Sequence, residues 1–264
     1  MSTTKMDEDV VVHFADITKL KNLQLDLQKK VHELERSNRN LEEFAYAASH
    51  DLKEPIRKIR IFTERLKTQL SKQLNENDLT TFDKIENASK RMGNLVDDLL
   101  QYSHVTHIST EMEWVDLNEK LHLVLEDLEL DIQEKSAVIH LTQLPIIKGY
   151  GRQIQQLFQN LISNGLKYCK AGVAPHIQII LGSSNEGGQI YHLIVVKDNG
   201  IGFKQEHSEK IFQMFSRLHR QGDYSGTGVG LSIVKKVIEN HNGIIRAEST
   251  PGEGAIFKVF LPAE

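Results

Sequence analysis

Apolar side chains recur every seven residues along the first part of the chain, which predicts a coiled coil. The d positions are Leu20, Leu27, Leu34, Leu41 and Ala48, and the a positions are Ile17, Gln24, Val31, Asn38 and Ala45. Polar residues at two a positions lower stability but favour one register and a low oligomer number. We therefore expect a coiled coil over residues 17–44 that joins two parallel copies of the chain. The alternative is a helix packed on its own domain.

Helical spacing of apolar residues continues beyond Pro55 in two further segments. The segments cover residues 56–74 and 82–99, and the polar turn 75–78 separates them. Two helices joined by a short turn form a hairpin, and two hairpins from two chains form a four-helix bundle that buries both stripes. Because proline lacks an amide hydrogen and its ring meets the preceding turn, we expect Pro55 to kink the first helix.

From about residue 109 the pattern changes to short apolar runs between glycine-containing turns. Helical patterns lie near residues 116–135, 151–168 and 229–240, and strand patterns near 137–141, 176–181, 190–197, 243–248 and 255–261. The last two strands are expected to form a hairpin across residues 250–254. This alternation is typical of a mixed α/β domain. Residues 203–225 are polar and poorly periodic, which predicts a mobile functional loop.

Composition and charge exclude several classes of protein. The 264 residues are 39% hydrophobic and 26% charged, as in an average folded protein, and the net charge of −4 gives no basic excess for nucleic-acid binding. The single cysteine, Cys169, indicates a reducing compartment, so we expect a cytoplasmic protein. No apolar run is long enough to span a membrane, and the polar N-terminus does not resemble a secretory signal.

His50 is the first residue with candidate chemistry. In the heptad frame it occupies position f, which points away from the seam, and Asp51 follows it directly. A carboxylate there could orient one imidazole nitrogen and accept its proton, which would leave the other nitrogen as a nucleophile. An ordinary surface histidine is the alternative.

Two polar groups follow in the α/β half. Asn160, Asn164 and Lys167 are spaced so that they share one helix face, where amide oxygens could coordinate Mg²⁺ and the lysine could meet a phosphate. Asp198 ends a strand before the turn Asn199-Gly200-Ile201-Gly202, and a buried carboxylate there could accept a hydrogen bond from adenine's amine. A solvated helix face and a simple turn are the respective alternatives.

A glycine-rich segment opens the last predicted helix. Residues 226–232 read Gly-Thr-Gly-Val-Gly-Leu-Ser, and such a segment lets backbone amides approach phosphate at a helix N-terminus. It is neither a Rossmann fingerprint, because no strand leads directly into it, nor a P-loop, because no Lys-Ser/Thr pair follows.

Taken in order, these segments resemble a sensor histidine kinase. The phosphoacceptor box corresponds to Ser49-His50-Asp51-Leu52 with Pro55, the N box to residues 160–168, the G1 box to 198–202, the F box to 211–215, the G2 box to 226–231 and the G3 box to 252–257. The resemblance covers residues 40–264. Each box alone is weak evidence, but six boxes in the right order are specific.

The resemblance implies a role for each matching residue. His50 would attack the γ-phosphate of ATP with Asp51 as base, and Asn164 would hold Mg²⁺ with Asn160 nearby. The remaining nucleotide contacts would be Lys167 and Arg217 on the phosphates, Tyr168 along the adenine, Asp198 with Gly200 and Gly202 at its amine, and Thr227, Gly228, Val229, Gly230 and Leu231 around the phosphates. Residues 203–225 would form the lid over ATP.

The resemblance also implies a fold class of type α + α/β and four parts. They are a possible remnant of a PAS domain over 1–16, a coiled-coil signalling helix over 17–44, a dimerisation and histidine phosphotransfer hairpin over 45–108, and an ATP-binding α/β sandwich of the GHKL type over 109–264. A chance match is the alternative for the PAS remnant, and too few residues precede it for the rest of such a domain, so we expect the sensor to be missing.

The implied activity is autophosphorylation of His50 from Mg-ATP in a homodimer, followed by transfer to an aspartate of a response regulator. A GHKL-type ATPase and a nucleotide-binding scaffold without phosphotransfer are the alternatives. Glu54 stands where the family often has Thr or Asn for dephosphorylating the regulator, as in phytochrome-like kinases, so phosphatase activity is not implied. Ala255 replaces a Thr or Ser that often follows Gly254, which removes one possible adenine-side hydrogen bond.

Overall fold

The computed structural model describes residues 2–6, 9–13, 16–71, 73–106, 111–218 and 226–263. The chain forms two compact units, residues 1–44 and 45–264. The first unit contains the antiparallel strands β1 (Ser2–Met6) and β2 (Asp9–His13) and the start of helix α1 (Thr18–Gln69), which continues into the second unit. The possible PAS remnant over residues 1–16 contains this pair of strands, its residues 14 and 15 lie outside the described part of the chain, and the PAS origin stays a prediction.

The heptad positions of α1 are uncovered in a single copy of the chain. Leu20, Leu27 and Leu34 at d are 65–72% exposed, and Val31 at a is 46% exposed. The side chains of residues 38–46 lie outside the described part of the chain. A seam of exposed leucines is what a coiled coil presents to its partner, and the pairing of two copies stays a prediction.

Helices α1 and α2 (Glu76–Thr106) form the predicted hairpin. The ammonium group of Lys67 lies 2.7 Å from Asp83 and 3.2 Å from Glu86, and Lys53 lies 2.6 Å from Asp97, so ion pairs join the helices at two levels. Helix α1 runs unbroken through Pro55. Among the described residues, no helix is long and apolar enough to cross a membrane.

Two reciprocal hydrogen bonds start helix α2. The amide of Asp78 donates to Asn75 Oδ1 at 3.0 Å, and the amide of Asn75 donates to Asp78 Oδ2 at 3.2 Å. This arrangement caps two amides that have no partner within the helix. The segment expected to be a polar turn is therefore the cap and first turn of α2.

The hairpin carries an exposed apolar face. Its members are Ile59, Phe62 and Leu66 of α1 and Ile85 and Met92 of α2, which are between 40% and 56% exposed. Side chains of this size are rarely left uncovered together on a folded domain. The face fits the predicted four-helix bundle, which needs a second hairpin.

The α/β domain follows the hairpin. Its elements are β3 (Glu113–Asp116), α3 (Leu117–Asp127), α4 (Glu129–Glu134), β4 (Val138–Leu141), β5 (Ile146–Gly149), α5 (Gly151–Lys167), β6 (His176–Glu186), β7 (Gln189–Asp198), the 3₁₀ turns η1 (Gln205–His207) and η2 (Lys210–Phe212), α6 (Gly230–Asn240), β8 (Ile244–Thr250) and β9 (Gly254–Pro262).

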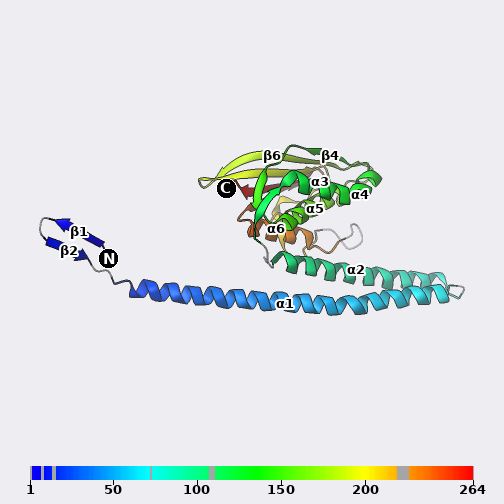
Figure 1. The fold of residues 1–264 in the computed structure, drawn as a ribbon. Coiled ribbons are helices and arrows are strands. Elements are labelled where there is room, and N and C mark those ends of the chain that lie inside the picture. The colour runs from blue at the N-terminus through cyan, green and yellow to red at the C-terminus, as the bar shows by residue number, and fades with distance from the viewer. Residues whose placement is uncertain are drawn as a thin grey trace. The chain divides into compact units, whose positions relative to one another are not determined.

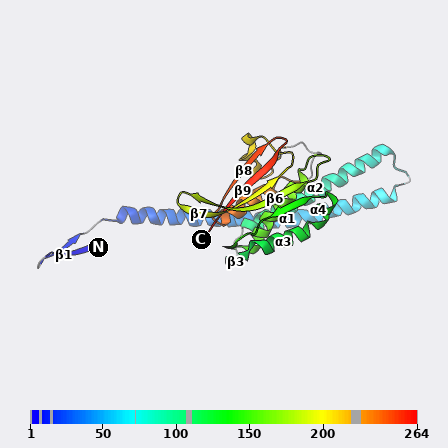
Figure 2. The same cartoon turned by 90° about the horizontal axis from the view of Figure 1, so that it is seen from above.

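The main sheet has the strand order β4-β6-β7-β9-β8. Strands β4 and β6 are parallel and the other neighbours are antiparallel, with β8 and β9 forming the predicted hairpin (Figure 2). Strands β3 and β5 pair in a small second sheet. Neither was predicted, because each has only two apolar residues and these are adjacent, whereas the equally short β4, which was predicted, has three.

Helices α3, α5 and α6 lie on the same side of the main sheet, and the core fills the space between these two layers (Figure 1). Helix α5 contributes Ile154, Leu157 and Phe158, each at most 1% exposed, and β6 contributes Ile177 and Ile179 at 0%. Alternate residues of β6 are buried, as expected for a strand covered on one face. The predicted α/β sandwich is confirmed.

A buried histidine joins α6 to the start of α5. His241 is 4% exposed, its Nδ1 lies 2.7 Å from the carbonyl oxygen of Val237, and its Nε2 accepts from the amide of Tyr150 at 2.9 Å. This network assigns a neutral ring with the proton on Nδ1. Burial lowers the pKa of His241 below its ordinary value of 6.5, because a charged imidazolium would lose its hydration.

We predict that acidification destabilises the domain through His241. Because the folded-state pKa is depressed, the unfolded chain binds more protons below pH 6.5, so the free energy of unfolding falls as the pH drops from 6.5 toward the folded-state value. The slope is at most about 1.4 kcal/mol per pH unit. Urea unfolding at pH 7.5 and 5.5 measures it.

The matched variants are His241→Gln, which cannot be protonated, and His122→Gln, which replaces an exposed histidine of α3. The difference in the free energy of unfolding between pH 7.5 and pH 5.5 should be smaller in His241→Gln than in the native chain. In His122→Gln it should be the same as in the native chain. If His241→Gln loses as much stability between these pH values as the native chain, His241 is not the cause of the loss.

Candidate functional site

Two adjoining cavities lie between α5, α6 and the ends of strands β7 and β9. They share five lining residues: Asn164, Tyr168, Ile211, Ser216 and Leu231. The first has an apolar wall, and the second is lined mainly by polar side chains and glycines. Together they form one continuous site with an apolar end and a polar end.

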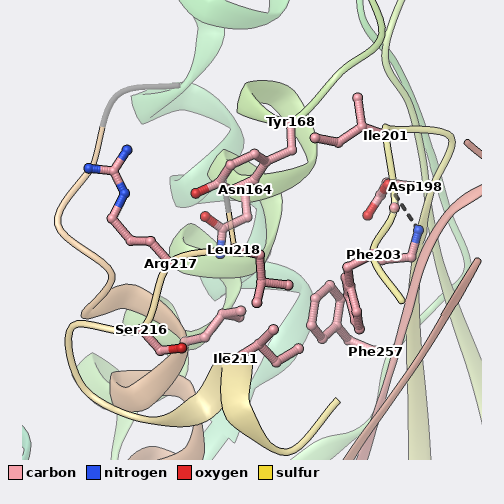
Figure 3. Close-up of a pocket in the computed structure, with 13 residues that line it drawn as sticks. Asn164, Tyr168, Asp198, Ile201, Phe203, Ile211, Ser216, Arg217, Leu218 and Phe257 are labelled. Carbon is pink, nitrogen blue, oxygen red and sulfur yellow. Dashed lines mark hydrogen bonds between the residues drawn. The ribbon is translucent and has the colours of Figure 1, made fainter. Parts of the chain in front are cut away.

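Asp198 marks the apolar end. Its neighbours in the cavity wall include Ile201, Phe203 and Phe257, and Figure 3 shows its carboxylate among them. Burial raises the pKa of Asp198, while hydrogen bonds from the amides of Gly200 and Ala255 oppose that rise.

The hydrogen bonds to Asp198 occupy one of its two oxygens. The amides of Gly200 and Ala255 donate to Oδ1 at 2.8 Å and 3.2 Å. Within the described residues Oδ2 receives no hydrogen bond of this kind, so it is the oxygen that a ligand's amine could reach. The backbone amide of Ala255 thus supports Asp198, although the side chain offers no hydroxyl.

The turn after Asp198 is held by close backbone packing. Gly202 has a φ of +62°, and a Cβ there would lie 2.2 Å from the carbonyl oxygen of Thr250. The amide of Gly252 donates to the carbonyl of Ile201 at 2.7 Å, so the turn rests on the β8–β9 hairpin. Only glycine fits this position, for both conformational and steric reasons.

Helix α5 supplies the polar end. Asn160, Asn164 and Lys167 all line the second cavity, which confirms that they share a helix face. The side-chain amide of Asn160 donates to the carbonyl of Gln156 at 2.9 Å, and its Oδ1 lies beside Gly230, where a Cβ would come within 2.7 Å. The oxygen of Asn160 therefore faces the glycine-rich segment.

The glycine-rich segment forms the opposite wall. Gly226, Thr227, Gly228 and Gly230 line the second cavity, and α6 begins at Gly230. Val229, at the N-cap position, makes no side-chain capping hydrogen bond. The first amides of α6 are therefore available for an anion.

Lys167 and Tyr168 form a pair at the junction of the two ends. The ammonium group of Lys167 donates to the hydroxyl of Tyr168 at 2.9 Å and lies 4.4 Å from the centre of its ring. It also lies against Gly226, where a Cβ would come within 2.3 Å. The positive charge of Lys167 is thus held where the two ends of the site meet.

Most residues predicted to contact the nucleotide line this site, but Gly200 and Val229 do not. Gly200 packs against the carbonyl of Tyr168 outside both cavity walls, and Val229 is fully buried in the core. Arg217 lines the apolar cavity and lies away from Asp198 in Figure 3, so its predicted contact with phosphate stays a prediction.

Sequence reasoning missed the apolar wall and two residues from the hairpin. The wall residues Ile201, Phe203, Ile211, Leu218 and Phe257 lie within or beside the named boxes, so the boxes could have indicated them. Asn94 and Asp98 of α2 also line the polar end, and no motif marks them.

The predicted phosphoacceptor segment lies in the middle of α1. Residue 50 is helical, but its side chain lies outside the described part of the chain, so its predicted orientation is untested. Asp51 is exposed, and Ser49 before it is fully buried. Glu54 pairs with Lys58 at 2.7 Å.

Family models match both halves of this arrangement. The model described as the His Kinase A (phospho-acceptor) domain matches residues 40–108, and the model described as the histidine kinase-, DNA gyrase B-, and HSP90-like ATPase matches residues 149–264. The chain belongs to the histidine kinase family.

Curated relatives are similar to this chain over most of its length. Phytochrome-like protein Cph1 of Synechocystis sp. is 37% identical over 237 residues, which are 90% of this chain and 31% of the relative. Sensor histidine kinase WalK of Bacillus subtilis is 31% identical over 241 residues, covering 88% of this chain and 38% of that protein. The chain spans about a third of the length of these relatives.

Solved structures support the fold. Full-length ShkA in complex with AMPPNP matches with a TM-score of 0.59 and 22% identity over 84% of this chain and 46% of that one. The histidine kinase AdeS of Acinetobacter baumannii matches with a TM-score of 0.51 and 21% identity over 78% of this chain and 95% of that one.

We predict that Gly202→Ala destabilises the domain more than Gly252→Ala does. Both glycines have positive φ, at +62° and +83°, but a Cβ at Gly252 would meet nothing within 4 Å. The second substitution should cost about 1–2 kcal/mol from backbone strain alone. The first should cost at least about 1 kcal/mol more from the clash with Thr250.

The free energy of unfolding of both variants, measured by urea titration, tests this comparison. Equal losses would show that the G1 turn does not rest on the β8–β9 hairpin in solution.

Proposed function

We propose that this chain is the kinase part of a sensor histidine kinase. It binds Mg-ATP, transfers the γ-phosphoryl group to His50, and passes that group to an aspartate of a response regulator. The observation that carries the proposal is the asymmetry of the site, with a buried carboxylate at an apolar end and a lysine, amides and a helix N-terminus at a polar end.

This asymmetry matches the chemistry of ATP. A purine is flat and largely apolar with an amine that can donate to Asp198, so it suits the end lined by Phe203 and Phe257. The phosphates are anionic and suit the end formed by Lys167 and the start of α6. The family model for an ATPase domain over residues 149–264 supports the same orientation.

The residues present fit a magnesium ion at the polar end. Asn160 and Asn164 offer side-chain amide oxygens beside the glycine-rich segment, and oxygen is the ligand that Mg²⁺ prefers. When bound there, the ion would neutralise charge on the phosphates. Lys167 would contribute a fixed positive charge to the same region.

The transfer itself follows from the family's phosphoacceptor box. A nitrogen of His50 attacks the γ-phosphorus, the bond to the bridging oxygen breaks, and ADP leaves with the electron pair. The imidazole proton passes to the carboxylate of Asp51, which follows in the sequence. The loose, anionic transition state is stabilised mainly by positioning and by positive charge.

Contacts along the hairpin connect the glycine-rich segment to the part of α2 that pairs with α1 near His50. Lys53, one helical turn after His50, pairs with Asp97 of α2 at 2.6 Å. The next residue, Asp98, accepts a hydrogen bond from Thr227 of the glycine-rich segment. The phosphate end of the cavity is thus linked to the hairpin within about one helical turn of the acceptor position.

The exposed seam of α1 and the apolar face of the hairpin favour a homodimer. Leu20, Leu27 and Leu34 offer a coiled-coil interface, and Phe62 and Leu66 offer a bundle core. Two chains would bury both surfaces at once.

We predict that His50→Gln abolishes transfer of labelled γ-phosphate from Mg-ATP to the chain. The substitution removes the nucleophilic nitrogen while the nucleotide site is untouched. The label on the native chain should be acid-labile and base-stable, and His104→Gln, which replaces an exposed histidine of α2, should retain it.

Two results would contradict the proposal. ATP turnover that survives His50→Gln, without label on the native chain, would indicate an ATPase. A native chain that does not bind Mg-ATP at all would indicate a scaffold without phosphotransfer.

Ser216 adds a further nucleotide contact to the proposal. It lines both cavities, and its hydroxyl oxygen is buried without a hydrogen-bond partner among the described residues. A buried hydroxyl without a partner is costly, and a ligand that spans both cavities would supply one.

We predict that Ser216→Ala weakens ATP binding about 2- to 10-fold, the loss of one neutral hydrogen bond. The stability of the nucleotide-free protein should be unchanged or raised, because an orphaned polar atom is removed. Calorimetric titration and thermal unfolding measure the two effects.

Ser183→Ala, at an exposed position of β6, is the matched control and should change neither quantity. An unchanged ATP affinity in Ser216→Ala would show that the hydroxyl does not contact the nucleotide.

A further inference from the structure

An acidic residue from outside the α/β domain lies at the phosphate end of the site. Asp98 of α2 lines the polar cavity together with Asn94, one helical turn earlier. Its Oδ2 accepts a hydrogen bond from the hydroxyl of Thr227. Thr227 belongs to the glycine-rich segment that is proposed to hold the phosphates.

Further contacts hold α2 in this position. The side-chain amide of Gln156 on α5 donates to Gln101 at 2.9 Å. The carbonyl of Val105 accepts from Gln153 at 3.2 Å and from Asn240 of α6 at 2.7 Å. Positions 94, 98, 101 and 105 share one helix face, so a single face of α2 rests on the α/β domain and carries Asp98 to the cavity.

The groups that surround Asp98 are groups that would also bind a phosphate. A threonine hydroxyl has one proton and can donate it either to Asp98 or to a phosphate oxygen, but not to both. Lys167 lines the same cavity, and its positive charge favours either anion. A carboxylate next to a polyphosphate would be repelled, because both carry negative charge.

We propose that Asp98 takes the place of a nucleotide phosphate, so that docking of α2 on the cavity and binding of ATP exclude one another. The proposal rests on the proposed function and adds a means of regulation to it. By linkage, ATP weakens the contact of α2 with the α/β domain by the same factor by which that contact weakens ATP binding. A signal that moves α2 would thereby change the affinity for ATP.

The test measures nucleotide affinity rather than phosphotransfer. AMPPNP with Mg²⁺, ADP and adenosine are titrated calorimetrically into the full chain and into Asp98→Ala and Asp98→Asn. Both variants should bind AMPPNP and ADP more tightly, by about 5-fold or more. Their affinity for adenosine should equal that of the native chain, because adenosine has no phosphate to compete with Asp98.

Asp97→Asn is the matched control. It removes the same charge one position away, from a residue that pairs with Lys53 instead of Thr227. Its affinity for AMPPNP should stay within about 2-fold of the native value, since charge at an exposed ion pair is largely screened.

Hydrogen exchange of residues 94–105 provides a second measurement. AMPPNP should raise exchange there in the native chain, because α2 leaves the cavity. In Asp98→Ala the exchange should already be high without nucleotide.

Each outcome of the titrations shows whether Asp98 competes with a nucleotide phosphate. Equal AMPPNP affinity in the native chain and Asp98→Ala, or weaker binding in the variant, would overturn the inference; weaker binding would make Asp98 a contributor to the site. Failure of every form to bind any nucleotide would overturn the proposed function as well. Binding by Asp98→Ala alone would support both.

Discussion

The close approach of helix α5 to strands β6 and β7 is the constraint on which the site depends. Gly165 lies where a Cβ would come within 2.8 Å of the Ile177 side chain and 3.6 Å of the Cβ of Asp198. A larger residue would push the helix away from the sheet. Asn164 beside it and Asp198 across from it would then no longer line one cavity, so the polar and apolar ends would separate.

The same packing explains why a charged group can be kept at the apolar end. Asp198 loses hydration in the wall beside Phe203 and Phe257, and two backbone amides compensate by donating to one of its oxygens. The turn that supplies one of those amides is fixed by Gly202 on the β8–β9 hairpin. The buried carboxylate of Asp198, the glycine turn and the β8–β9 hairpin therefore depend on one another.

The helical hairpin contributes to the site and also carries the proposed acceptor, His50. One face of α2 contacts α5, α6 and the glycine-rich segment, while the apolar face with Met92 is left exposed. A second chain on the exposed face and the α/β domain on the other would both act on α2. In the proposed dimer, α2 would lie between the second chain and the nucleotide site, so a movement of this helix would affect both.

The sequence by itself determined the element types, the order of the six boxes and the face shared by Asn160, Asn164 and Lys167. These features follow from local periodicity and from glycine positions, because a few neighbouring residues are enough to determine local backbone structure. The family followed from the order of the boxes. The short strands β3 and β5 were missed because each has only two apolar residues, which are adjacent and show no alternation.

Only the tertiary structure decided what surrounds these residues. The burial of the Ser216 hydroxyl, the apolar wall and the contact between Asp98 and Thr227 all depend on segments far apart in the chain. Asp98 illustrates the reason: it is one of many acidic residues on a polar helix face, and nothing in its neighbours marks it. Its role arises from which element packs against it, and packing between distant segments leaves no local signal in the sequence.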